Sequence, residues 1–219
     1  MLTRFFSSLI TLLCLTSALS AHQVWIEELD GKLVVRFAEY GEDYEKSPGR
    51  LDSLITPQAW TTGDDGKPAV FEVQKKADHF LIAGATTAKG ALAETGFPVM
   101  KRGEDPARKP NFYARWHHAA AGEAKPAMMF DIVPTGTPGE VQVFFRGKAL
   151  PDTKVFIVPP GGKEEELTTD KDGKAKFTIG KSGNYFLYCK HHREDLPGFS
   201  GGVAYEALSH NCSLLWKQP

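Results

Sequence analysis

Residues 185–216, YFLYCKHHREDLPGFSGGVAYEALSHNCSLLW, decide the fold of this chain because the two ends of the stretch predict one antiparallel pair of strands. Side chains alternate between the two faces of a strand, so every second residue shares a face. With Cys189 opposite Cys212, like residues meet along the pair. A slip of one residue would bring polar side chains to this face, so its burial fixes the register. The predicted partners are Tyr185 with Trp216, Leu187 with Leu214, Cys189 with Cys212, and His191 with His210.

The first 21 residues have the pattern of a secretory signal peptide. Arg4 gives a positive start, residues 5–15 are apolar and residues 16–21 are mostly small. Two cleavage sites fit this pattern equally well, before Ala21 or before His22. We expect a periplasmic chain, and no later segment is long and apolar enough to span a membrane.

Composition predicts an all-β fold with two β-sandwich domains. Gly and Pro are plentiful, the apolar runs are short and alternating, and long stretches with helical periodicity are absent. The net charge of −1 gives no basic footprint for nucleic acid. We expect a linker at 134–139, PTGTPG, between an N-terminal β domain at 22–134 and a C-terminal sandwich at 139–219.

Residues 22–38 predict the first hairpin, with Asp30-Gly31 as its turn. Counting outward pairs Ile26 with Val35 on the core face and Trp25 with Arg36 on the other, as a cation–π contact. The same count places His22 opposite Glu39.

The segment that follows, 39–56, predicts a short helix that starts after Ser47, with Glu42, Asp43 and Glu45 as a solvated acidic face. Further strands are expected at 69–74, 79–83, 98–101, 112–116 and 128–133. The module after the linker predicts strands at 141–145, 154–158, 165–169 and 174–179.

The C-terminal module resembles the transthyretin-like and carboxypeptidase-regulatory-like sandwiches. The resemblance rests on FFRGKALPDTKVFIVPPGG, LTTDKDGKAKFTI and SGNYFLYCKHH. It implies an Ig-like sandwich and no activity. The hydroxyisourate hydrolases of that group end in a YRGS motif, whereas this chain ends in SLLWKQP.

The chain from residue 21 onward also resembles a bacterial periplasmic family of unknown function, grouped with periplasmic components of nickel and cobalt uptake. The segments that carry the resemblance are AHQVW at 21–25, FAEYGEDYEKSPGRLDSL at 37–54, NFYARW at 111–116 and GGVAYEALSHNCSLL at 201–215. The resemblance implies a secreted β-rich protein with a part in metal handling.

Cys189 and Cys212 have two interpretations. In an oxidising compartment a pair of facing cysteines favours a disulfide. With His191 and His210 one step along the strands, the same patch is also a candidate for a tetrahedral site of two cysteines and two histidines. The connection 192–209 is long enough to be a binding loop.

His22 and Glu39 form the other candidate metal site, with His191 or His210 as an additional ligand if the domains fold back on each other. If cleavage exposes His22, its amino group and ring chelate one Cu(II) or Ni(II); otherwise it is a solvated residue near a chain end.

These residues predict a periplasmic binding or accessory protein for nickel, cobalt or copper, with a membrane transporter or another periplasmic component as partner. The alternative is a non-catalytic module that binds a protein or a glycan. No motif for a nucleophile, phosphate loop or dinucleotide is present, so we expect no enzyme. A copper oxidase is considered only if His22 is the first residue.

Overall fold

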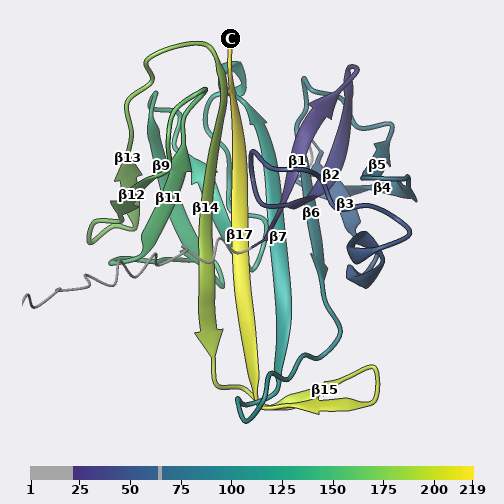
Figure 1. Ribbon diagram of the computed structural model, residues 1–219. Coiled ribbons are helices and arrows are strands. Elements are labelled where there is room, and N and C mark those ends of the chain that lie inside the picture. The colour runs from purple at the N-terminus through teal and green to yellow at the C-terminus, as the bar shows by residue number, and fades with distance from the viewer. Residues whose placement is uncertain (1–21, 64–65) are drawn as a thin grey trace, which may run out of the picture.

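The computed structural model describes residues 22–63 and 66–219, and this part of the chain is all-β, as predicted (Figure 1). The predicted signal peptide at 1–21 lies outside the described residues. The strands are β1 Gln23–Leu29, β2 Lys32–Ala38, β3 Gln58–Thr62, β4 Pro68–Lys75, β5 Phe80–Ala83, β6 Ala91–Gly96, β7 Arg108–His118, β8 Phe130–Pro134, β9 Glu140–Phe145, β10 Lys148–Ala149, β11 Lys154–Val158, β12 Glu165–Thr168, β13 Lys174–Lys176, β14 Gly183–Glu194, β15 Gly198–Ser200, β16 Val203–Tyr205 and β17 Ala207–Gln218. Two short 3-10 helices, η1 Arg50–Ser53 and η2 Ala119–Ala121, interrupt them.

Three long strands, β7, β17 and β14, form the middle of the main sheet (Figure 1). The order of that sheet is β1-β2-β5-β4-β3-β6-β7-β17-β14-β11-β12. β17 is antiparallel to β14 and parallel to β7. Strands of the N-terminal half and strands of the C-terminal half therefore belong to one sheet.

The expected linker at 134–139 is instead the turn of a hairpin. β8 and β9 pair antiparallel across it, from Phe130 opposite Phe145 to Pro134 opposite Val141. Pro and Gly mark tight turns as strongly as they mark linkers, so composition alone did not separate the two. Strands on both sides of the expected boundary share one sheet, since β7 precedes it and β17 follows it.

Two buried clusters lie on opposite faces of the central strands. The first includes Phe112, Trp116 and Tyr188. It is covered by strands of the N-terminal half, where β1 packs across β7 and β17. The Ser213 hydroxyl donates to the carbonyl of Val24 at 2.7 Å across this contact. The second cluster includes Cys212 and Leu214 and lies between the central strands and the small sheet of β8, β9, β10 and β13. This face-to-face packing of two sheets is the predicted sandwich.

The first hairpin has the predicted register, with Trp25 opposite Arg36 and Ile26 opposite Val35. Both turn residues have positive φ, 50° at Asp30 and 74° at Gly31, as a type I′ turn requires. The predicted contact between Trp25 and Arg36 is wrong. The Arg36 guanidinium lies 3.8 Å from the centre of the Tyr44 ring and binds Glu27 at 2.7 Å.

The segment 39–56 contains less helix than predicted. Only η1 forms, with Gly49 rather than Ser47 as its N-cap. The Asp52 carboxylate accepts hydrogen bonds from the Ser47 hydroxyl at 2.7 Å and the Gly49 amide at 2.9 Å. These bonds close a tight loop instead of starting a regular helix. The expected strand at 98–101 is a single bridge at Met100, and β3 and β6 were not predicted.

Candidate functional site

A β-bulge in β14 separates two consecutive histidines. The predicted pairs hold from Tyr185 opposite Trp216 to Cys189 opposite Cys212, and then the register shifts. His192, not His191, lies opposite His210, so the fourth predicted pair is wrong. His191 has φ 61°, and its backbone amide donates to the Asn211 side-chain oxygen at 3.0 Å. One extra residue in a bulge turns the following side chains to the other face.

The bulge brings His191 to a cavity of about 680 Å³, which His22 and Glu39 also line. We call this the pocket. The side chains come from both halves of the chain, because β17 supplies Ser209 and Asn211 beside β7. The full lining is His22, Phe37, Glu39, Arg50, Ser53, Phe97, Pro98, Met100, Arg102, Arg108, Pro110, Phe112, His191, Ser209 and Asn211.

His22 stands among carboxylates at one end of the pocket. Its Nε2 lies 2.5 Å from Glu45 Oε1, and its Nδ1 lies 3.8 Å from Glu39 Oε1. Glu45 also pairs with Arg50 at 3.2 Å. The predicted neighbourhood of His22 and Glu39 is thus present. Glu45, expected on a solvated face, is half-buried and holds the ring. A carboxylate on one nitrogen orients an imidazole and makes it a better ligand.

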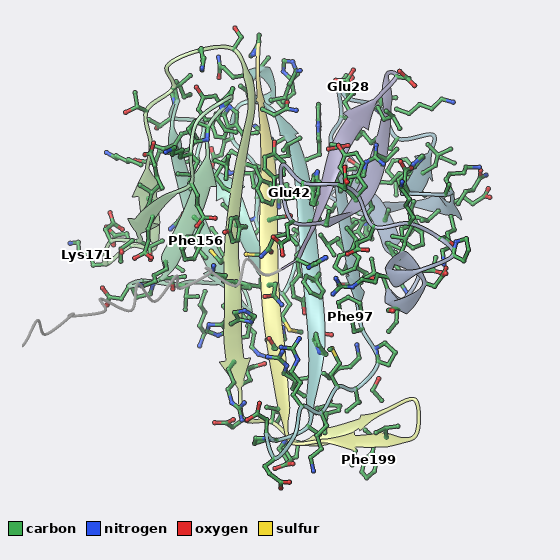
Figure 2. The ribbon with its side chains drawn as sticks, viewed as in Figure 1. Glu28, Glu42, Phe97, Phe156, Lys171 and Phe199 are labelled. Carbon is green, nitrogen blue, oxygen red and sulfur yellow. The ribbon has the colours of Figure 1, made fainter. Side chains whose placement is uncertain are left out.

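Aromatic rings form one wall of the pocket. The centroids of His22 and Phe37 are 5.1 Å apart, those of Phe37 and Phe97 5.3 Å, and those of Phe97 and Phe112 5.6 Å. Phe97 follows β6 and lies beside β7 (Figure 2). Such a wall accommodates the carbon skeleton of an organic ligand.

Cationic side chains gather near His191. Burial lowers the pKa of His191, and the positive charges of Arg108, Lys190 and Arg102 lower it further. The imidazole is therefore neutral at pH 7. Within the ranges 22–63 and 66–219, neither Arg102 nor Arg108 forms an ion pair. Both guanidinium groups are available to an anion in the pocket.

His210 lies on the other face of the sheet and does not line the pocket. Its side chain is 1% exposed, with Nδ1 3.1 Å from the Tyr113 hydroxyl and Nε2 3.1 Å from Glu194 Oε2. Arg146 binds the same carboxylate through two nitrogens, at 3.1 and 2.9 Å. Burial lowers the pKa of His210, and Glu194 opposes that shift. His210 is a partnered histidine of the sandwich, and the structure does not bring it to His22.

Cys189 and Cys212 face each other as predicted, but in the structure they are two buried free thiols and do not form the predicted disulfide. Burial raises the pKa of the Cys212 thiol. His191 points to the opposite face, so the alternative site of two cysteines and two histidines is not assembled. Among the residues that the structure describes, no group of three or more histidine, cysteine, aspartate or glutamate side chains is arranged to hold a metal ion.

Sequence reasoning missed Glu45, Arg50, Arg102, Arg108 and Asn211. Arg102 lies in RGEDP, which reads only as a turn, and Asn211 alternates with residues that were assigned to the core. Arg108 and Asn211 come together through the parallel pairing of β7 with β17, for which the local sequence carries no signal.

Comparison of the chain with protein-family models gives no match, and comparison with the curated proteins gives none either. None of the helices in the described ranges is long and apolar enough to cross a membrane.

Proposed function

We propose that this chain is a periplasmic protein that binds a transition metal, nickel, cobalt or copper, for an uptake system. The observation that supports the proposal most is the convergence of His22, Glu39 and His191 on one pocket, although they come from opposite ends of the sequence. Imidazole suits all three metals, and copper leads in intrinsic affinity. The metal is cargo here and takes no part in a reaction.

The His22 end of the pocket supplies the primary ligands. Glu39 and Glu45 approach the two ring nitrogens from different sides, so a metal at one nitrogen displaces one carboxylate and keeps the other as an orienting partner. If the signal peptide is removed before His22, the new amino group adds a chelating nitrogen. Protons compete for these nitrogens, so binding weakens as the pH falls through the histidine range.

Titration calorimetry with Ni(II) and Cu(II) tests the proposal on exported protein whose N-terminus is verified by intact mass. We expect His22→Ala to weaken binding at least about tenfold, since an imidazole ligand is lost. His79→Ala is the matched control, because His79 pairs with Asp78 outside the pocket. Equal affinity in His22→Ala and wild type, or no binding in either, overturns the proposal.

The exported form carries, in this proposal, a disulfide between Cys189 and Cys212. The support is their direct opposition on β14 and β17 and the oxidising nature of the periplasm. The bridge would stiffen the ladder directly before the bulge that presents His191.

A second candidate function is a non-catalytic interaction module for a protein or glycan. One observation favours it: the β15–β16 hairpin projects from the end of the molecule, and Phe199 in the middle of β15 is 78% exposed (Figure 2). Val203 on the same hairpin is 54% exposed. Binding to immobilised glycans and to the extracytoplasmic segments of a metal transporter, with and without chelator, separates the two candidates. This module predicts binding that Phe199→Ser weakens and that metal removal leaves unchanged.

A further inference from the structure

The pocket is much larger than a metal ion. A water molecule occupies about 30 Å³ in the liquid, whereas the pocket measures about 680 Å³. That volume lies within the usual range of roughly 300–1,000 Å³ for small organic ligands. His22 and its carboxylates occupy one end only. The rest of the cavity has room for a small organic ligand.

The charges of the pocket are divided between its ends. Glu39 and Glu45 surround His22 at one end, where Arg50 already pairs with Glu45. Arg102, Arg108 and His191 line the pocket together. A cation is favoured at the first end and an anion at the second. The aromatic wall of Phe37, Phe97 and Phe112 connects them.

We propose that the pocket takes its metal as a chelate with a small organic polycarboxylate, and that Arg102 and Arg108 bind the free carboxylates. This inference rests on the proposed function and names the form of its cargo. The metal sits beside His22 and Glu39, where one imidazole and a carboxylate fill part of its coordination sphere. The chelator fills the rest.

The chemistry of the cationic end suits carboxylates. A guanidinium group presents its N–H donors in a planar fork that matches a carboxylate with two parallel hydrogen bonds. His191 lines the same pocket, and its ring carries an N–H donor in either protonation state. The Asn211 contact at 3.0 Å holds its backbone in place. A carboxylate also ligates nickel and cobalt, so one molecule reaches both ends of the pocket.

The test compares three probes by titration calorimetry: Ni(II) alone, citrate alone, and the 1:1 Ni(II)–citrate complex. We expect the complex to bind the wild-type chain at least about tenfold more tightly than either component, because it alone satisfies both ends. Arg102→Gln/Arg108→Gln should lose that advantage and keep the affinity for Ni(II) alone. Lys148→Gln/Lys171→Gln is the matched control, since it removes the same charge at exposed sites that do not line the pocket. Lys148 lies in β10, and Lys171 lies at the edge of the sandwich (Figure 2). Thermal unfolding of each variant verifies that it is folded.

Three outcomes overturn the inference and separate it from the proposed function. If Ni(II) alone binds as tightly as the complex and the arginine variant matches wild type, the cargo is the free ion and only the chelate is rejected. If citrate alone binds as tightly as the complex and His22→Ala changes neither, the pocket is a carboxylate site and the metal function falls too. If no probe binds, both fall.

Discussion

The two faces of the β7–β17–β14 ladder differ in how their charged side chains are paired. We define the sandwich face by Tyr113, Arg115, His117, His210 and Cys212, and the pocket face by Phe112, His191, Ser209 and Asn211. On the sandwich face, Arg115 binds Asp131 at 3.0 and 2.6 Å, and Tyr113, His210, Glu194 and Arg146 form one chain of bonds. On the pocket face, the arginines near His191 have no ion-pair partner among the described residues.

This difference between the faces indicates which histidine stabilises the fold and which can bind a ligand. Consecutive residues, His191 and His192, go to different faces only because of the bulge. Buried polar groups with all their partners present stabilise a fold, and removal of one partner leaves the other buried without a hydrogen bond. Polar groups that line a cavity without partners contribute little to stability. Substitutions on the two faces should therefore have very different costs.

The largest expected effect is that of Asp131→Ala on the sandwich face. Asp131 is fully buried and accepts bonds from Arg115 and from the Ala127 amide at 2.9 Å. Its loss leaves the Arg115 charge, 6% exposed, without a counter-ion. We expect a loss of about 3–5 kcal/mol in the free energy of unfolding, measured by urea titration. Glu39→Ala on the pocket side should cost less than about 0.5 kcal/mol. Similar costs would contradict the comparison.

The second largest expected effect is a loss of stability at acid pH that comes from His117. Burial, then the Arg115 charge, lowers the pKa of His117 from 6.5 to about 4. Between these values the unfolded chain binds a proton that the folded chain does not, so stability is full above pH 6.5 and falls as the pH drops towards 4. The shift corresponds to about 3 kcal/mol. Urea titrations from pH 7 to 4 measure it, and His117→Gln should flatten the curve. An unchanged slope in that variant would contradict the assignment.

The cysteine pair should give a similar or slightly smaller effect. If the exported chain carries the Cys189–Cys212 disulfide, reduction should lower the free energy of unfolding by about 2–4 kcal/mol. Urea titration with and without reductant measures the loss, and the Cys189→Ser/Cys212→Ser variant should not respond to reductant. Mass mapping of the native exported protein checks the premise, and two free thiols there would rule the bridge out.

The smallest expected losses in the free energy of unfolding are those of substitutions at His210 and His191. His210→Ala removes a partner from both Tyr113 and Glu194 and should cost about 1–3 kcal/mol. His191→Asn should cost less than about 0.5 kcal/mol, because Asn tolerates the positive φ at this position. Denaturation midpoints give both values. An equal or greater cost for His191→Asn would show that the bulge histidine is structural.

The sequence alone predicted the parts of the fold that depend on alternation. The first hairpin and the pairing up to Cys189 and Cys212 follow from period-2 patterns with a buried face. The bulge was not predictable, because His191 adopts positive φ without the Gly or Asn that normally signals it. β6 was missed because its residues, ALAETG, have low strand propensity and form a strand only through pairing with β3 and β7.

The candidate site was predictable only in part. The hairpin count placed His22 near Glu39, since both belong to one local unit. The presence of His22 and His191 in one pocket depends on strands far apart in sequence. It requires β1 to pack across β17 and β17 to pair with β7, and neither arrangement has a local signature. Arg102 and Arg108 belong to the site for the same reason.

The position of β17 has a consequence for how the chain acquires its fold. β17 follows all the other described strands in sequence, yet it lies between β7 and β14 and touches β1 through the bond from Ser213 to Val24. Neither buried cluster is closed until this strand is in place. Contacts between such distant residues slow folding, because the intervening chain must be ordered first. The two buried clusters of the emerging polypeptide therefore stay open until β17 has been synthesised.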